Sequence, residues 1–302
     1  MCSRVALLAL SFGVAGLIHV ETARAAQIFS DSFETYTAAG SPLDKNTAGP
    51  NAAPNGSGNP WFGPAPPNAR VVNTEGGVLP FTGANMIRGS APSDFDENWV
   101  NLAYRFNGGT PFAGGLAMNF RFYDPLGSGA TANTYRDFAG VGYYDTAPGN
   151  TDYPGTGSLN AGVVNIQRLV LGASSDTGGT YDPTKYQVRV VGRTDGYNGG
   201  SGWFNTPVSR TVGWHLGRIV IGDALPDGTN PVDFYIDNTA TPAFSSNSVT
   251  NFGYNVIELN TNYGTTAGYM DDVVLSTSAI PEPATGMFAA SAGLLVLRRR
   301  RR

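Results

Sequence analysis

Acidic side chains that could perform glycoside hydrolysis are scarce in this chain. That reaction needs two carboxyl groups about 5 to 9 Å apart across the scissile bond. The nearest acidic cluster, Asp94-Phe95-Asp96-Glu97, follows Ala91-Pro92-Ser93, a context that favours a turn. Between residues 26 and 280 the glutamates are far apart in the sequence: Glu34, Glu75, Glu97 and Glu258. The sequence therefore indicates no catalytic pair, and we expect the protein not to be an enzyme.

Histidine and cysteine chemistry is equally limited. His215 is the only histidine beyond residue 25, so one chain cannot build a zinc site from two or three histidines. A serine triad would have to use His215, but no Gly-x-Ser-x-Gly turn is present to carry the nucleophile. The two glycine motifs that bind nucleotide phosphates, the Walker A loop and a Gly-x-Gly-x-x-Gly run that opens a helix, are both absent. We expect His215 to pack or hydrogen-bond at a strand edge. Cys2 is the only cysteine, so a disulfide within the chain is excluded.

Aromatic residues among polar ones offer a different chemistry, the stacking of rings against sugars. The segment Asp195–Asn205 combines Tyr197 and Trp203 with glycines and amides, and Tyr144 and Tyr153 belong to a second such stretch. Aromatic faces with amides and carboxylates nearby are what a carbohydrate-binding loop needs. These four residues are therefore candidate contacts to an exopolysaccharide. The alternative is that the rings only close the open end of a sandwich.

The elements that must position these residues are strands. Forty glycines and 20 prolines leave little material for helices, and glycine turns such as Asp227-Gly228 separate alternating segments. No repeat of fixed period is present, which argues against a propeller or solenoid. We predict eleven strands: Gln27–Tyr36, Ala69–Asn73, Trp99–Phe106, Leu116–Tyr123, Phe138–Tyr144, Ala161–Leu171, Lys185–Val191, Trp214–Ile221, Val232–Ile236, Tyr254–Leu259 and Tyr269–Ser276. The pattern predicts an all-β fold, a two-sheet antiparallel β-sandwich forming one domain over residues 26–280.

Residues 40–68 do not fit a strand assignment. They contain seven prolines among many Asn, Gly and Ala residues, and we predict a long irregular loop. Trp61-Phe62 in the middle of this loop indicates at least one docking point, because exposed aromatic side chains would be costly there.

The first 25 residues predict an export signal read by the Sec machinery. Arg4 supplies a positive start, Val5–Val20 an apolar helix and Ala23-Arg24-Ala25 a small-x-small site. We therefore expect cleavage between Ala25 and Ala26, which would leave the mature protein outside the cytoplasm. The alternative is a permanent anchor over Val5–Val20.

Residues 281–302 form a second targeting pattern in three parts. The parts are Pro281, Glu282 and Pro283, then the uncharged segment 284–297, then Arg298, Arg299, Arg300 and two further arginines. A helix over 284–297 would cover about 21 Å of a hydrocarbon core about 30 Å thick, so we predict a short membrane helix suited to temporary anchoring. Clustered arginines stay on the cytoplasmic side, which leaves Pro281 at the outer face.

This order of parts resembles the PEP-CTERM sorting signal of Gram-negative bacteria. The resemblance covers residues 281–302. It implies that the precursor sits transiently in the inner membrane, that an exosortase processes it, and that the mature protein reaches the cell surface or extracellular matrix. The alternative is a tail anchor that is never cut.

The charge of the chain between these two signals differs from that of the whole sequence. Setting aside seven of the 19 basic residues and two of the 23 acidic ones leaves 12 basic and 21 acidic residues over 26–280, a net charge of −9. Such a surface argues against nucleic acid or anionic lipid as a partner and suits a secreted protein or a cation-binding one.

Four short segments resemble the concanavalin A-like lectin and glucanase sandwich. They are Phe29–Glu34, Gly213–Leu216, Phe234–Asn238 and Tyr269–Leu275. The resemblance implies a jelly roll whose first and last strands lie side by side. It also implies the alternative function, a polysaccharide-cleaving hydrolase or lyase, although the Glu-x-Asp-x-x-Glu run and the Gln-x-His pair of such enzymes are absent.

The same resemblance implies a candidate structural calcium site. Pairing of the first and last strands would bring Asp31 and Glu34 near Asp271 and Asp272, and Ca²⁺ takes six to eight oxygen ligands. Asp271 and Asp272 would point to opposite faces of a regular strand, so one ion could use both only at a bulge or turn. The alternative is that one aspartate accepts backbone hydrogen bonds while the other is solvated.

Overall fold

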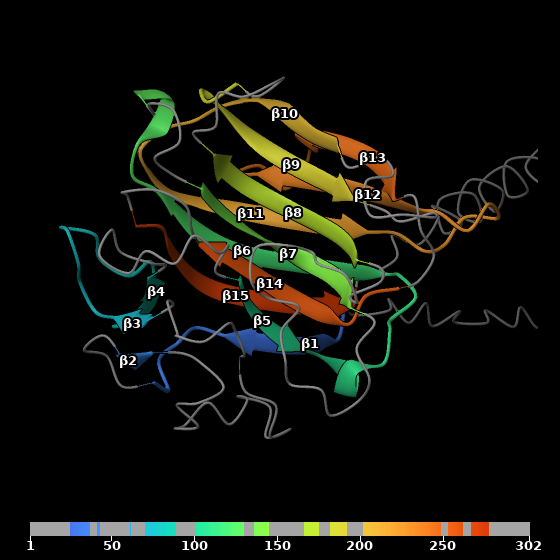
Figure 1. The fold of residues 1–302 in the computed structure, drawn as a ribbon, viewed down its shortest axis with the longest axis horizontal. Helices are drawn as coiled ribbons and strands as arrows, with labels where there is room; N and C mark the ends of the chain where they lie inside the picture. Colours follow the sequence, from blue (N-terminus) through green and yellow to red (C-terminus); the bar gives the residue numbers. More distant parts are fainter. Residues whose placement is uncertain are drawn as a thin grey trace, which may run out of the picture. The chain divides into compact units, whose positions relative to one another are not determined.

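Two antiparallel β-sheets packed against each other make up the structure, a computed structural model of the 302-residue chain (Figure 1). The structure describes residues 25–36, 41–42, 61, 70–88, 101–129, 136–144, 166–174, 182–191, 202–248, 253–261 and 267–277. Within these residues the all-β, two-sheet antiparallel sandwich predicted from the sequence is confirmed.

The larger sheet has nine strands in the described chain. These are β1 (Gln27–Asp31), β2 (Ser41–Pro42), β3 (Arg70–Val72), β4 (Met86–Arg88), β6 (Leu116–Asp124), β11 (Gly213–Ile221), β12 (Asn230–Ile236), β13 (Phe244–Ser248) and β15 (Tyr269–Thr277). Their order is β13-β12-β11-β6-β15-β4-β3-β2, and β1 pairs with β15 beside that path.

The smaller sheet has six strands in the described chain. These are β5 (Asn101–Arg105), β7 (Arg136–Tyr144), β8 (Ile166–Ser174), β9 (Lys185–Val191), β10 (Gly202–Ser209) and β14 (Val256–Thr261). Their order is β10-β9-β8-β7-β14-β5. Two short 3-10 helices, η1 (Asn107–Gly109) and η2 (Gly127–Gly129), flank β6.

Alternation along the strands places the core between the sheets. In β6 the side chains of Met118, Phe120 and Phe122 are buried, and Arg121 lies on the outward side, half-buried. Phe122 meets Tyr186 of β9 edge-on across the sandwich, with ring centroids 5.5 Å apart. Burying a large apolar side chain contributes roughly 1.5–3 kcal/mol, so a core of this kind can hold a fold that has no disulfide.

All eleven predicted segments contain strands, with shifted bounds at some ends. The strand predicted over Gln27–Tyr36 ends at Asp31, because Phe33 takes a positive φ of 61° and turns the chain. The strand predicted to end at Leu171 continues to Ser174.

Four further strands, β2, β4, β10 and β13, were not predicted. The sequence Gly202–Ser209 lies in β10, so placing Trp203 on a loop was wrong. β10 and β13 lie at one edge of each sheet, and an edge strand tolerates Pro207 or a polar run such as Phe244–Ser248. Such strands therefore lack the alternation that identifies central ones.

The first and last strands lie side by side, as the predicted architecture requires. β1 pairs antiparallel with β15, with Gln27 opposite Ser276 and Asp31 opposite Val273. This pairing brings Asp31 into the same region as the aspartates of β15.

Trp61 confirms the predicted docking point in the 40–68 loop. Its indole is 1 % exposed and packs edge-on against Phe29 and Tyr104, at centroid distances of 5.5 and 5.6 Å. Ser41 and Pro42 pair with β3 at the sheet edge. The rest of this predicted loop lies outside the described residues.

The predicted targeting segments, residues 1–24 and 281–302, also lie outside the described residues, so the signal helix, the membrane helix and the domain boundaries stay predictions. Among the residues that are described, no helix has the length and apolar character needed to span a bilayer.

Candidate functional site

Asp271 and Asp272 lie at a β-bulge in β15. The register with β6 shifts between Asp271 and Val274, and Asp272 adopts a positive φ of 47°. The bulge lets both carboxylates reach one residue: Asp271 Oδ2 accepts the backbone N–H of Thr82 at 3.1 Å, and Asp272 Oδ1 accepts the Thr82 hydroxyl at 2.8 Å. The adjacent N–H of Phe81 also donates to Asp271, at 2.9 Å. The strand therefore has the bulge that two aspartates would need in order to share one ligand. In this structure the two carboxylates bind residues 81–82 instead.

Asp271 is an unusual carboxyl group because its side chain is 0 % exposed. Burial raises the pKa of Asp271 to about 7; the charge of Asp272 adds to the rise, and the backbone N–H groups of residues 81, 82 and 272 oppose it. Asp271 therefore holds its proton more tightly than an exposed aspartate does.

Glu34 holds the next part of the same segment. Its carboxylate accepts the backbone N–H groups of Ala84, at 3.0 Å, and of Asn85, at 2.9 Å. Gly83 between them takes a positive φ of 63°, and a side chain there would collide with the Glu34 carboxylate. Segment 79–85 is thus held by three acidic side chains: backbone N–H groups donate to Asp271 and Glu34, and the Thr82 hydroxyl donates to Asp272.

Asp31 has a separate role in the sandwich. Its buried carboxylate accepts the backbone N–H of Phe33 at 2.7 Å, the Tyr36 hydroxyl at 2.8 Å and the Trp61 indole N–H at 2.7 Å. Burial raises the pKa of Asp31, and these three donors oppose the rise. Asp31 is therefore the polar anchor of Trp61.

The calcium site stays a prediction. Asp31, Glu34, Asp271 and Asp272 all accept protein hydrogen bonds in this structure. Across the described ranges no three acidic, histidine or cysteine side chains converge as metal ligands.

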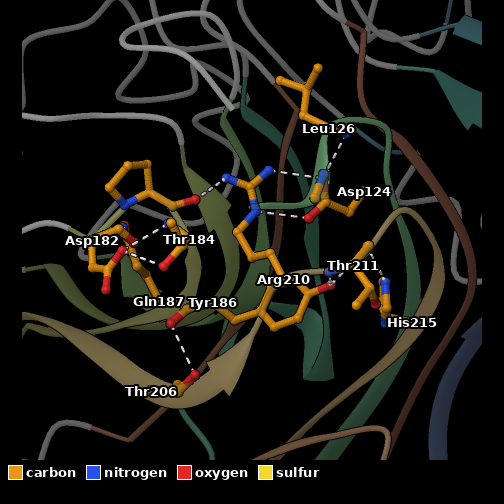
Figure 2. Close-up of polar contacts among 12 residues, drawn as sticks. Asp124, Leu126, Asp182, Thr184, Tyr186, Gln187, Thr206, Arg210, Thr211 and His215 are labelled. Carbon is orange, nitrogen blue, oxygen red and sulfur yellow. Dashed lines mark hydrogen bonds and ion pairs between the residues drawn. The ribbon is translucent and has the colours of Figure 1, made fainter. Parts of the chain in front are cut away.

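A buried ion pair joins the two sheets at one end of the sandwich. Arg210, directly after β10, donates from Nε and Nη2 to the two carboxylate oxygens of Asp124 in β6, each at 2.8 Å. Nη1 of Arg210 donates to the backbone carbonyl of Pro183 at 3.0 Å (Figure 2). Both side chains are essentially unexposed. The two parallel hydrogen bonds make this a bidentate ion pair, which we call the Arg210–Asp124 pair.

His215 lies next to the Arg210–Asp124 pair, and each of its ring nitrogens has a hydrogen-bond partner. Nδ1 is 2.7 Å from a carboxylate oxygen of Asp237, and Nε2 is 2.8 Å from the backbone carbonyl of Thr211. Both partners only accept hydrogen bonds, so the protonated imidazolium is the form of the ring that satisfies both contacts. His215 therefore makes structural hydrogen bonds beside Phe122 and Tyr186 and has no free nitrogen to act as a base.

Replacing His215 with glutamine is expected to cost more stability in acid than in base. Burial by itself lowers the pKa of His215, but the hydrogen bonds to Asp237 and Thr211 and the nearby acidic charges raise it above 6.5 overall. Its stabilising contribution is complete below that unfolded value and is lost as the pH rises through the folded value. Urea unfolding of both proteins at about pH 5 and about pH 9 measures the difference. An equal loss at both pH values would contradict the charged pair.

The outward side of the six-stranded sheet carries one aligned row of residues. The register places Glu258, Gly140, Val170 and Arg189 opposite one another across β14, β7, β8 and β9. Gln187, two residues before Arg189, occupies the next row opposite Gly172. Glu258 is 0 % exposed, and it is the only acidic residue among the outward positions of these four strands that the structure describes. Arg189 follows Gln187 at the spacing that a Gln-x-His pair has. The third position therefore holds an arginine instead of a histidine, and arginine does not act as a base.

The outward side of the nine-stranded sheet carries a cluster of rings, the aromatic patch: Phe81, Tyr123, Trp214 and Tyr269. The register places Tyr123 opposite both Trp214 and Tyr269. Ring centroids are 5.5 Å apart for Tyr123 and Trp214 and 6.1 Å apart for Phe81 and Trp214. The guanidinium of Arg121 lies 4.0 Å from the centre of the Phe81 ring.

The aromatic patch is partly open to solvent. Phe81 is 40 % exposed and the neighbouring Leu79 is 63 % exposed, while Tyr123 and Trp214 are half-buried. The Trp214 indole donates to the Leu79 carbonyl at 2.9 Å, which fixes the ring against segment 79–85. An exposed ring with an arginine and carboxylates close by is suited to holding the apolar face of a pyranose and its hydroxyl groups.

The four residues that define this patch differ from the four predicted sugar contacts. Tyr197 and Tyr153 lie outside the described residues, and for Trp203 and Tyr144 only the backbone is described, in β10 and at the end of β7. The sequence did contain one indication of the patch, because the alternation along Leu116–Tyr123 places Tyr123 on the polar face of its strand. Phe81 carried no comparable signal.

Comparisons with known proteins give structural likeness alone. No protein-family model and no curated protein matches the sequence. A carbohydrate esterase of the Shiga toxin-encoding bacteriophage phi24B is 13 % identical, with a TM-score of 0.42 and coverage of 84 % of this chain and 99 % of its own. A protein of unknown function from Shewanella oneidensis MR-1 is 13 % identical, with a TM-score of 0.43 and coverage of 87 % and 91 %. An endo-1,3-beta-glucanase from Streptomyces sioyaensis is 14 % identical, with a TM-score of 0.40 and coverage of 83 % and 96 %.

Proposed function

We propose that this chain is a secreted, non-catalytic protein of the cell surface or extracellular matrix that binds polysaccharide through the aromatic patch. In this proposal the amino-terminal signal exports the chain, and an exosortase acts at Pro281, Glu282 and Pro283. The observation that carries the binding role is the partly exposed ring of Phe81 beside Trp214 and Arg121 on the outward side of a sheet.

The rigidity of the patch supports binding. Tyr123 and Trp214 stand on central strands, and Asp271 and Thr82 fasten the segment that carries Phe81. Rings held in place before a ligand arrives lose little conformational freedom on binding, which favours affinity. The net charge of −9 over residues 26–280 favours a neutral glycan over an acidic one.

Three features support a role without catalysis. Both nitrogens of His215 are engaged in structural hydrogen bonds. Of the carboxylates that hold segment 79–85, Asp271 and Glu34 are bound by backbone N–H groups and Asp272 by the Thr82 hydroxyl. Glu258 has no second acid among the described outward positions of its neighbouring strands, where two-carboxylate hydrolysis would need one.

The alternative function is a polysaccharide-cleaving enzyme. The observation in its favour is the row of Glu258 and Arg189 on the outward side of the six-stranded sheet. Glycans that become shorter during incubation with the protein, and stay intact with Glu258→Gln, would replace the binding proposal with this one.

Replacing Phe81 with alanine is expected to weaken glycan binding about 2- to 10-fold, because one aromatic contact contributes roughly 0.5–1.5 kcal/mol. A glycan array of neutral and acidic oligosaccharides, with calcium present, measures it. Phe204→Ala is a matched control, since Phe204 is also 40 % exposed but lies on β10 of the other sheet. No binding above background by the wild-type protein, or equal losses in both variants, would contradict the proposal.

A further inference from the structure

Two arginines on the outward side of the nine-stranded sheet each lie over an aromatic ring. The guanidinium of Arg121 is 4.0 Å from the centre of the Phe81 ring, and that of Arg218 is 5.7 Å from the centre of the Tyr235 ring. Arg218 on β11 is directly opposite Tyr235 on β12. The aromatic patch therefore has a counterpart on the same side of the sheet, which we call the Arg218–Tyr235 pair.

The strand register separates this pair from the aromatic patch by a defined distance. β6, β11 and β12 are consecutive in the sheet (Figure 1). Trp214 and Arg218 are four residues apart on β11, so they share a side of the sheet and lie roughly 13 Å apart along the strand. Arg121 is opposite Leu216, midway between them, and is a diagonal neighbour of Arg218 about 7–8 Å away. A single sugar ring is too small to bridge the two places, whereas a chain of several rings can span them.

Both guanidinium groups have hydrogen-bonding capacity left over. In the part of the chain that the structure describes, Arg121 and Arg218 contact aromatic rings and form no hydrogen bond or salt bridge. A guanidinium has five N–H donors in a planar fork, which suits the adjacent oxygens of a sugar. Nε of Arg218 is buried, so the head of this side chain is held close to the sheet. The Tyr235 ring beside it is half-buried and keeps part of its surface open to solvent.

The charge of this face differs from that of the whole chain between residues 26 and 280. The outward positions of β6, β11 and β12 carry two arginines and one aspartate, Arg121, Arg218 and Asp233. Asp237, directly after β12, adds a second aspartate. These charges cancel, although residues 26–280 have a net charge of −9. A balanced face with rings and unpaired donors is complementary to an uncharged glycan.

We propose that the Arg218–Tyr235 pair is a second glycan subsite, and that β6, β11 and β12 together bind an internal stretch of an extended, uncharged polysaccharide. This inference rests on the proposed binding at the aromatic patch and deepens it. Tyr235 stacks against one sugar ring, and Arg218 donates to its hydroxyl groups. Phe81 and Arg121 hold a ring further along the same chain. Once one subsite is filled, binding at the other is intramolecular, so a long glycan gains affinity over a short one.

The test compares short and long glycans on the purified protein by isothermal titration calorimetry. The probes are cello-, laminari-, xylo- and manno-oligosaccharides, each as a disaccharide and a hexasaccharide. We expect the wild type to bind a hexasaccharide more tightly than the disaccharide of the same series. Tyr235→Ala is expected to weaken hexasaccharide binding about 2- to 10-fold, the effect of one lost aromatic contact, and to change disaccharide binding much less.

Three further variants separate a binding role from a structural one. Tyr235→Phe keeps the ring and is expected to bind like the wild type. Arg218→Gln keeps the ring but removes the guanidinium fork, and it is expected to weaken hexasaccharide binding selectively. Phe81→Ala is expected to weaken binding of both lengths. Thermal unfolding of each variant shows whether it is folded.

The possible failures are distinguishable. Equal affinity of the wild type for a disaccharide and its hexasaccharide would overturn the inference and leave the proposed binding role intact. The same conclusion would follow if folded Tyr235→Ala and Arg218→Gln kept the wild-type affinity for the hexasaccharide while Phe81→Ala lost it. Absence of wild-type binding to every probe would contradict the proposed function and the inference together.

Discussion

Replacing Arg210 with alanine is expected to destabilise the protein by about 3–5 kcal/mol, because it leaves a buried carboxylate without its cation. Asp124 is 0 % exposed and receives two of its hydrogen bonds from Arg210. The pair also joins β6 of one sheet to the end of β10 in the other, so its loss loosens the contact between sheets. Denaturant unfolding followed by circular dichroism measures the change in free energy.

A double variant separates the cost of an unpaired charge from the value of the pair. Arg210→Met combined with Asp124→Leu removes both charges, and replacing a whole buried pair with apolar residues is often close to neutral. We therefore expect the double variant to be more stable than Arg210→Ala. A loss below about 1 kcal/mol for Arg210→Ala, in the range of exposed pairs, would show that water reaches Asp124.

Replacing Trp61 with alanine is expected to cost about 3–5 kcal/mol, the range for a large aromatic side chain removed from a core. Trp61 is 1 % exposed and packs against Phe29, Phe33 and Tyr104. The same change takes one donor from the buried Asp31 carboxylate. The stability that Trp61→Ala loses therefore has two sources, a cavity in the core and a weakened hydrogen-bond network at Asp31. Thermal or denaturant unfolding measures their sum.

Two matched variants assign the parts of this loss. Trp61→Phe keeps a ring but removes the indole N–H, so it is expected to lose about 1–3 kcal/mol from the less satisfied Asp31. Phe204→Ala removes a ring that is 40 % exposed and is expected to cost much less than Trp61→Ala. A loss for Trp61→Ala no larger than that for Phe204→Ala would mean that Trp61 does not anchor its segment.

The central strands could be predicted because their pattern is local. β6, β11 and β12 each alternate buried and outward side chains along seven to nine residues, and that alternation is visible in the sequence. β10 and β13 could not be predicted in the same way, because an edge strand has fewer neighbours to select its residues. Trp203 was therefore assigned to a loop although it lies on β10.

The candidate site was less accessible to prediction. The sequence singled out Asp31, Glu34, Asp271 and Asp272 as acidic residues that strand pairing would gather, and β1 does pair with β15. It gave no indication that residues 81–85 would occupy three of these carboxylates, two through backbone N–H groups and Asp272 through the Thr82 hydroxyl. Phe81 joins the aromatic patch through the same backbone contacts.

The sequence by itself determined the strand-rich composition, the alternation of the central strands, the absence of a second histidine beyond residue 25 and the acidic balance over residues 26–280. These are properties of residue type and of spacing between near neighbours. Only the tertiary structure decided that Arg210 meets Asp124, 86 positions away, that Trp61 donates to Asp31, and that Thr277 closes on Ala26. Such partners depend on which strands become neighbours and on where each loop returns to the sheet, and burial of the whole core fixes both.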